Sequence, residues 1–388
     1  MKKIFSSFSS HCLCMFLAVV AFSSCLNNGE DTIVLENGKA TIAGIPSDAD
    51  ATPNPTIDGN TTSIPNVLYT IEYEGDDAIV RLDMTGIQDA EDESGWLRLL
   101  GTGFGGEQNI WVEVDGQPKG ILVYNTADDQ NNDAKVKADL VFLVDNSGSM
   151  GQEADAIARD IVSWSQKLNN SGLDMQYGCV GYDGSITGAL NITDAESLAK
   201  YLNYGSGTSR TYHFEGTDAT VLKEASQEYY NSYRECGVAA LRFADEHFTF
   251  RTGANRIYVN FTDEPNQPGG KEDFSVEYVN NVEKWNTSKG TIHTVYSSST
   301  NFKEIALQEE FPWKMSDYTG GTFLTASSSF TGVTLESLPV TGAMMNSYVI
   351  RFTDVADLMD GMPHEVKITI LSPDGKTKAE RTFYIIFG

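Results

Sequence analysis

Three residues with oxygen-bearing side chains directly follow a short, uninterrupted apolar run in the middle of the chain. Residues 140–144 form an uninterrupted hydrophobic stretch, and Asp145, Ser147 and Ser149 come next, spaced two residues apart. Carboxylate and hydroxyl oxygens are hard ligands, which suit Mg²⁺, Mn²⁺ or Ca²⁺ and do not suit zinc or copper. Asp and Ser also cap helices, and a helical pattern follows here, so a simple N-cap is the alternative interpretation.

A buried parallel strand would place these side chains where ligands bind. A continuous apolar run is typical of a central strand covered on both faces, and such sheets bind ligands at the carboxyl ends of their strands. A second strand of this kind is predicted at residues 256–261, and it ends at Thr262 and Asp263. A second carboxylate is therefore expected at the same edge of the sheet.

Strands and helices alternate through the middle of the chain. Helices are predicted at residues 154–168, 195–202, 235–248, 274–285 and 302–309, and further strands at 175–182 and 291–296. Alternation over this length indicates an α/β domain with a doubly wound sheet.

The pentapeptide at residues 145–149 resembles the Asp-x-Ser-x-Ser signature of the metal-ion-dependent adhesion site (MIDAS) in von Willebrand factor A (vWA) domains. Asp263 resembles the second acidic position of that family, although Glu264 and Pro265 stand where Gly usually follows. The resemblance implies a doubly wound vWA (Rossmann-like) domain at residues 137–346 with a bound divalent cation. Mg²⁺ is the ion expected first, with Mn²⁺ and Ca²⁺ as alternatives. The implied partner is a protein that supplies an Asp or Glu carboxylate to the metal.

The family also implies a hydroxyl ligand between the two acidic loops, and two residues are candidates for it. Thr217 lies in a Gly-Thr pair but far upstream of Asp263, whereas Ser232 stands immediately before the helix predicted at residues 235–248. Either residue could instead cap a helix, and the sequence leaves the choice open.

The amino terminus resembles a bacterial lipoprotein signal. Two lysines precede an apolar segment at residues 12–22, and Ser23 and Ser24 precede Cys25, the expected lipidation site. The apolar segment is short for a membrane span, so we expect the membrane to be contacted by the lipid anchor only. A plain secretory signal or a membrane anchor is the alternative. Acidic residues soon after Cys25 favour the outer membrane and the cell surface, with the periplasmic face as the alternative.

The segments on either side of the α/β domain have a different pattern. Residues 25–66 are rich in Pro, Asn, Asp and Thr and are predicted to be a tether. Short alternating runs in residues 67–136 and 347–388 indicate antiparallel strands;. We expect both flanks to form one all-β sandwich, with two separate sandwiches as the alternative, and we place Trp96 and Trp111 in its core rather than on a sugar-binding surface.

Composition narrows the classes of function. The formal net charge of −27 argues against a nucleic-acid partner;. Cys179 and Cys236 are expected to be separate core thiols rather than a disulfide. No phosphate-binding loop, nucleophile elbow or paired nucleophile and base is present, so no catalytic residue and no enzyme is predicted. The expected function is metal-dependent protein binding or adhesion, and the alternative is an envelope scaffold or assembly subunit whose ion only stabilises loops.

Overall fold

The computed structural model describes most of the chain from residue 33 to residue 387. The described residues are 33–36, 39–42, 44–74, 77–92, 95–126, 137–150, 153–170, 173–202, 216–217, 220–232, 234–297, 310–327 and 339–387. Cys25, the predicted signal and the predicted helix at 302–309 lie outside these ranges. None of the helices within them is long and apolar enough to cross a membrane.

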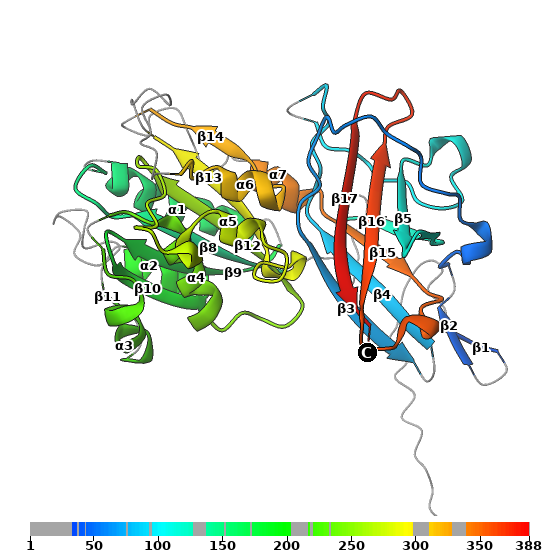
Figure 1. Ribbon diagram of the computed structural model, residues 1–388, viewed down its shortest axis with the longest axis horizontal. Coiled ribbons are helices and arrows are strands. Elements are labelled where there is room, and N and C mark those ends of the chain that lie inside the picture. The colour runs from blue at the N-terminus through cyan, green and yellow to red at the C-terminus, as the bar shows by residue number, and fades with distance from the viewer. Residues whose placement is uncertain are drawn as a thin grey trace, which may run out of the picture.

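A seven-stranded sheet forms the centre of the α/β unit, in the order β11-β10-β9-β8-β12-β13-β14 (Figure 1). Its strands are β8 (Lys137–Asp145), β9 (Asp174–Tyr182), β10 (Ile186–Thr193), β11 (Gly216–Thr217), β12 (Ala254–Thr262), β13 (Thr291–Tyr296) and β14 (Phe323–Thr325). Strand β8 runs parallel to β9 and β12, and β13 and β14 continue in the same direction, whereas β10 is antiparallel to β9. The carboxyl ends of β8, β9 and β12 therefore meet at one edge.

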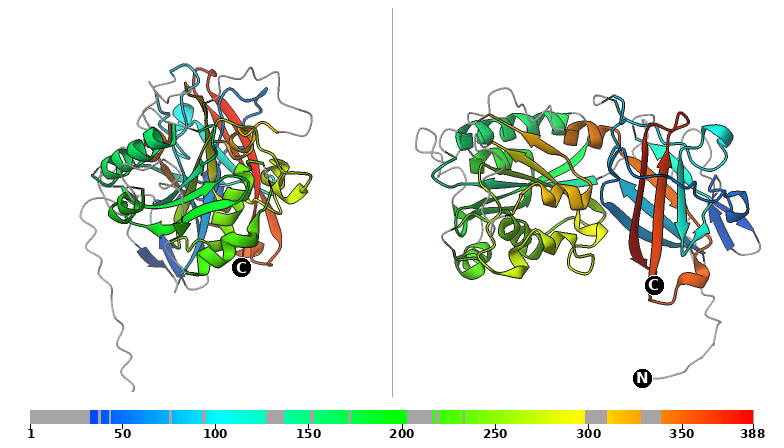
Figure 2. Two further views of the ribbon diagram at one scale, coloured as in Figure 1. Left: turned by 90° about the vertical axis from the view of Figure 1, so that its left-hand side faces the viewer. Right: turned by 45° about the horizontal axis from the view of Figure 1, so that its top comes forward.

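Helices cover both faces of this sheet, as the right-hand view of Figure 2 shows. Helices α1 (Glu153–Asn170), α2 (Ala195–Leu202) and α7 (Pro339–Met345) pack on one face. The other face is covered by α3 (Thr220–Tyr229), α4 (Gly237–His247), α5 (Glu277–Asn280) and α6 (Lys314–Thr319). Coverage on both faces is the reason that residues 140–144 are apolar without alternation.

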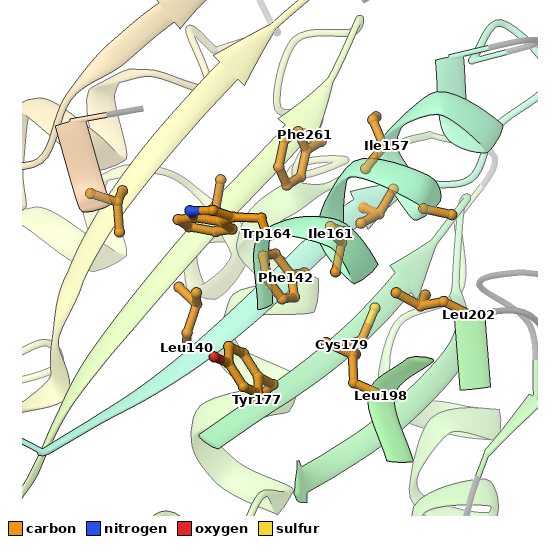
Figure 3. Packing of buried hydrophobic residues seen from close by; sticks show 14 of the residues in the cluster. Leu140, Phe142, Ile157, Ile161, Trp164, Tyr177, Cys179, Leu198, Leu202 and Phe261 are labelled. Atoms are coloured by element: carbon orange, nitrogen blue, oxygen red, sulfur yellow. The ribbon is translucent and has the colours of Figure 1, made fainter. Parts of the chain in front are cut away.

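Large side chains fix α1 on the sheet close to the candidate metal loop. Trp164 and Phe142 are almost fully buried, and their rings meet edge to face with centroids 5.9 Å apart (Figure 3). Ile157 and Ile161 pack from the same helix, and Leu198 comes from α2. Truncating one such aromatic residue to Ala typically costs about 3–5 kcal/mol. This packing holds the start of α1, and with it the loop that precedes it, against β8.

Two four-stranded sheets form a β-sandwich beside the α/β unit, in the orders β3-β4-β15-β7 and β17-β16-β5-β6. Their strands are β3 (Val67–Glu74), β4 (Asp77–Met84), β5 (Ile110–Val114), β6 (Gln117–Pro118), β7 (Leu122–Asn125), β15 (Tyr348–Phe352), β16 (Pro363–Leu371) and β17 (Lys378–Ile386). Each sheet combines strands from before and after the α/β unit, because β15 pairs with β4 and β7 and β16 pairs with β5. An α/β unit joined to a β-sandwich is the architecture that the sequence predicts. A separate hairpin of β1 (Ile33–Glu36) and β2 (Lys39–Ile42) precedes them.

Some predicted elements differ from the observed ones. Residues 96–100 form only an isolated bridge between Trp96 and Gln88, and neither Trp96 nor Trp111 belongs to the hydrophobic cluster of the sandwich. The predicted helix at 274–285 is reduced to the four-residue α5 and flanking turns. Strand β10 and helix α3 were not predicted.

The segment before β3, which its composition predicts to be a tether, lies along the sandwich. Asn54 donates from Nδ2 to Thr369 Oγ1 at 3.0 Å on β16, and Trp111 Nε1 of β5 donates to Thr52 Oγ1 at 3.0 Å. Farther along, the backbone N–H of Thr61 donates to the carbonyl of Lys378 on β17 at 2.8 Å. The segment therefore crosses the β17-β16-β5 sheet before it enters β3.

Polar contacts join the sandwich to the amino ends of the α/β strands. Asn66 donates from Nδ2 to the Gly290 carbonyl at 2.7 Å, and its backbone N–H donates to Thr291 Oγ1 at 3.1 Å, at the start of β13. Arg381 of β17 donates to the carbonyl oxygens of Ile64 and Thr319. Because the amino ends are fastened to the sandwich, the carboxyl ends of the parallel strands point away from it.

Candidate metal site

The loop after β8 folds its polar side chains around one point. Asp145 is fully buried, and its Oδ1 accepts the backbone N–H of Ser147 at 2.9 Å. The Ser147 and Ser149 hydroxyls lie 2.8 Å apart, and the N–H of Asn146 donates to the Tyr182 carbonyl at 2.7 Å, which ties the loop to β9. Three of the predicted ligands are therefore gathered by local backbone geometry.

The loop after β12 brings the second carboxylate to the same point. Ser149 Oγ donates to Asp263 Oδ1 at 3.1 Å, and Thr262 Oγ1 donates to Asp145 Oδ2 at 2.8 Å. Asp145, Ser147, Ser149 and Asp263 thus form one chain of hydroxyls and carboxylates across two loops that are 114 residues apart in sequence at the Ser149 contact.

Ser232 lies between two loops at this edge. Its backbone N–H donates to the Gly184 carbonyl at 2.7 Å, in the loop after β9. Its hydroxyl is 3.7 Å from the position that a Cβ on Gly269 would take, in the loop after β12. The residue therefore sits with its hydroxyl close to the loop that carries Asp263.

Thr217 occupies a different place. It pairs with Ala189 of β10 in the edge strand β11, and Ala189 is in register with Val180 of β9, which faces Leu143 of β8. Three strand spacings separate its backbone from β8, about 14 Å. The structure does not bring the backbone of Thr217 to the Asp145 loop.

Strand β8 buries an aspartate near each end, and the two have different partners. Asp139 is fully buried, and Arg251 Nε lies 2.6 Å from its Oδ1. Asp145 accepts hydrogen bonds from the uncharged donors of Ser147 and Thr262, and within the described part of the chain it forms no ion pair. Burial, together with a smaller contribution from the charge of Asp263, raises the pKa of Asp145 to about 7, although the hydrogen bonds of Ser147 and Thr262 oppose the rise. A cation at this point would favour the charged carboxylate.

Other carboxylates add to the negative charge of this edge. Burial raises the pKa of Glu235, and the charges of Asp183 and Asp263 contribute to the rise. Asp183 follows β9, and Glu235 precedes α4. Acidic side chains from three loops therefore influence one another here, which is the electrostatic setting that a divalent cation stabilises.

The donor set fits a hard divalent cation. The gathered side chains offer only carboxylate and hydroxyl oxygens, which is the chemistry of Mg²⁺, Mn²⁺ and Ca²⁺ sites. The described ranges contain no group of three or more His, Cys, Asp or Glu side chains that could hold a metal. A site here would therefore depend on the serine hydroxyls as much as on the two aspartates.

Thr262 is the residue of this site to which the sequence analysis gave no role. Its hydroxyl accepts the backbone N–H of Glu264 at 3.0 Å while it donates to Asp145, so it is held in place from both sides. A hydroxyl residue directly before an aspartate at the end of a buried strand is the signal that could have identified it.

Cys179 and Cys236 are both free and buried, as expected. Cys179 packs in the cluster between the sheet and α1, whereas Cys236 belongs to the cluster on the opposite face. Burial raises the pKa of both thiols, that of Cys236 to about 12.

Comparisons with known proteins found distant likenesses only. No family model matches the chain, and no curated protein matches it. Among solved structures, the chain is similar to proximal thread matrix protein 1 of the mussel byssus, with 13% identity and a TM-score of 0.34 over 50% of this chain and 45% of that one. It is also similar to a mutant of the PilB minor pilin from Streptococcus sanguinis, with 13% identity and a TM-score of 0.33 over 70% and 76% of the two chains. A third is the manganese-loaded TRAP protein of Plasmodium vivax, with 13% identity and a TM-score of 0.29 over 68% and 95%. The chain spans less than half of the mussel protein, and likenesses at this level decide neither family nor function.

Proposed function

We propose that this chain is a cell-surface binding protein whose α/β unit is a vWA-type domain with a MIDAS-type site for a divalent cation. The observation that carries the proposal is the buried Asp145, which lies beside Asp263 and two serine hydroxyls. The other buried aspartate of the same strand, Asp139, has its cation in Arg251. A metal ion would supply the corresponding positive charge at Asp145.

In this proposal each side chain has a distinct part. Ser147 and Ser149 supply hydroxyl ligands, Asp263 supplies a carboxylate from the second loop, and Asp145 holds the serine loop in shape through the Ser147 N–H. Ser232 is the better candidate for the remaining hydroxyl, because it lies against the loop of Asp263 and Thr217 is on an edge strand. A bound Mg²⁺ attracts an outside carboxylate, so the partner is a protein that presents an Asp or Glu.

The direction of the site suits a tethered protein. Lipidation at Cys25 would anchor the chain in the outer membrane, and we place the α/β unit on the cell surface. The carboxyl edge with Asp145 points away from the sandwich, which is the part that follows the tether in sequence. We propose binding rather than catalysis, and the raised pKa values of the two buried thiols make both of them poor nucleophiles;.

Calorimetric titration with Mg²⁺ and Mn²⁺, after chelator treatment, tests the proposal. Saturable binding is expected in the unmodified chain and in Asp317→Ala, a control that removes an exposed carboxylate from α6. Binding should be lost in Asp145→Ala and weakened at least tenfold in Ser149→Ala, whose exposed position makes misfolding less of a concern;.

Two results would speak against this function. Absence of saturable binding in the folded, unmodified chain contradicts the metal site. A second result would favour the alternative hypothesis of an envelope scaffold, in which the ion only stabilises the loops. In that case metal would raise thermal stability, but the chain would not capture a carboxylate-bearing partner in a metal-dependent way.

A further inference from the structure

A cavity of about 230 Å³ lies where the sandwich meets the α/β unit. Its walls come from both sides of this junction. They include Ser63, Thr85 and Trp96 from the sandwich side and His293, Gly321 and Thr322 from the α/β side. At the liquid volume of about 30 Å³ per molecule, this is room for about eight waters, which is the scale of one sugar ring.

The lining is polar but carries no acidic or strongly basic side chain. Because the chain has 54 Asp and Glu residues, a lining without any carboxylate is unusual for this protein. Hydroxyls and amides such as those of Ser63, Thr85 and Gln88 both donate and accept hydrogen bonds. This pattern suits a neutral molecule with many hydroxyl groups and disfavours an ion, whose charge would lose its water without a partner.

His293 contributes a hydrogen-bond donor of fixed orientation. The backbone N–H of Thr322 donates to its Nδ1 at 3.1 Å, and the Thr322 hydroxyl lies 2.8 Å from the same nitrogen. A ring nitrogen that accepts an N–H carries no proton, so the hydrogen of the neutral ring is on Nε2. Burial lowers the pKa of His293 to about 4, which keeps the ring neutral. The described residues provide no hydrogen-bond partner for Nε2, and the side chain lines the cavity.

Trp96 is held in the junction by glycines. A Cβ on Gly342 of α7 would lie 2.3 Å from the indole ring, and one on Gly86 would lie 2.8 Å from it. Any larger residue at either position would displace the ring. The ring is therefore fixed where it lines the cavity, and it provides an apolar wall beside the hydrogen-bonding groups, as small-molecule sites usually do;.

We propose that the junction cavity binds a neutral polyhydroxylated molecule of monosaccharide size. Trp96 forms part of the apolar wall, His293 Nε2 donates to a hydroxyl, and the polar side chains of the lining supply the remaining hydrogen bonds. Because His293 belongs to β13 and Trp96 to the sandwich side, the ligand would bridge the two units. For a ligand of about twelve heavy atoms, a Kd of about 1 mM is expected.

Saturation-transfer NMR on the intact chain tests this site with glucose, galactose and N-acetylglucosamine, with glucuronate as the charged counterpart of glucose. Signals are expected for at least one neutral sugar, in the presence of chelator and in Ser149→Ala, because the cavity is separate from the Asp145 loop. Glucuronate should bind at least tenfold more weakly. Failure of the metal titrations would leave this result unchanged, so the two proposals are distinguishable.

Three variants test whether the signal arises in the cavity. Ser63→Tyr fills the rim from an exposed position and should abolish binding, and Thr56→Tyr, in the same segment but outside the lining, should retain it. His293→Phe removes the donor and should weaken binding at least tenfold. The proposal is overturned if no neutral sugar gives a signal, or if Ser63→Tyr binds as well as the unmodified chain.

Discussion

Thr262 Oγ1 donates a hydrogen bond of 2.8 Å to Asp145 Oδ2, and this contact links the ends of two adjacent parallel strands. The other oxygen of the same carboxylate accepts the Ser147 N–H. Both oxygens of a fully buried carboxylate are therefore fixed before any ion is bound, and the Ser147–Ser149 loop is held in a shape that gathers its hydroxyls.

Thr262→Val is expected to weaken Mg²⁺ binding about 10–100-fold, the usual effect of removing a residue that orients a ligand. It should also lower the free energy of unfolding by about 1–3 kcal/mol, since Asp145 Oδ2 loses its donor in a buried position. Calorimetry and urea unfolding measure the two effects. Thr262→Ser keeps the hydroxyl and serves as the control; equal losses in both variants would mean that shape, not the hydrogen bond, matters.

Metal should stabilise the chain by an amount that depends on its concentration. With free Mg²⁺ at 100 times Kd, linkage predicts an increase of about 2.7 kcal/mol in the free energy of unfolding. Chelator should remove this increase, and Ser149→Ala should show much less of it at the same Mg²⁺ concentration. Denaturant titrations with and without Mg²⁺ provide the measurement, and an unchanged midpoint in the unmodified chain would contradict a site specific to the folded state.

The ion pair at the other end of β8 is expected to be essential for stability. Arg251→Met leaves the fully buried Asp139 without its cation, and such a loss typically costs about 3–5 kcal/mol;. Arg159→Met, at an exposed position on α1, is the matched control and should change stability little. Chemical unfolding of the two variants decides the matter, and similar midpoints would refute a structural role for the pair.

The stability of the sandwich should fall as the pH rises through the pKa of His364. Hydrogen bonds to Asp115 and Asp360 raise the pKa of His364, and the bond to His364 lowers the pKa of Asp115. The pKa of Asp360 is lowered first by the backbone N–H of Met362 and then by His364. The histidine contribution is therefore complete below its unfolded pKa of about 6.5 and is lost above the raised folded value, while the carboxylates contribute only above their own range. His364→Gln should flatten the pH dependence of thermal unfolding above about pH 6, where the histidine of the unfolded chain begins to lose its proton. A dependence that survives the substitution would assign it to other groups.

Arg381→Met tests the junction between the two units. The guanidinium donates to the carbonyls of Ile64 and Thr319, and its burial lowers the pKa of Arg381 to about 10. Without it, these contacts between β17, the segment before β3 and α6 are lost, and the α/β unit is expected to unfold separately from the sandwich. We expect calorimetry to show one transition for the unmodified chain and two for the variant. A single transition in the variant would indicate that the contacts of Asn66 and its neighbours are sufficient.

The sequence was most informative where local pattern and burial coincide. Residues 140–144 are apolar on both faces because helices cover both faces of β8, and the following turn places Asp145 and two serines by itself. Asp263 was equally predictable, since it follows a strand of the same kind.

Contacts between distant segments explain what the sequence did not reveal. The short runs around Trp96 resemble a strand, but the ring is held between Gly86 and Gly342, and the second of these lies 246 residues away;. The role of Thr262 depends on β12 lying next to β8, and the choice between Thr217 and Ser232 depends on the pairing of β11 at the sheet edge. In the segment predicted as a helix at 274–285, Asn281 accepts backbone N–H groups with its side chain, which favours turns;.

The chain enters the α/β unit after β7 and leaves it through α7 into β15, and these two strands are antiparallel neighbours in which Asn125 faces Tyr348. A tensile load applied at the Asp145 edge would therefore reach the sandwich at the same ends of two adjoining strands. Because both ends would be pulled in the same direction, β7 and β15 would be drawn together, and the load would pass in shear to the hydrogen bonds between β15 and its other neighbour, β4. Two adjoining strands of one sheet would thus share any load that the α/β unit carries.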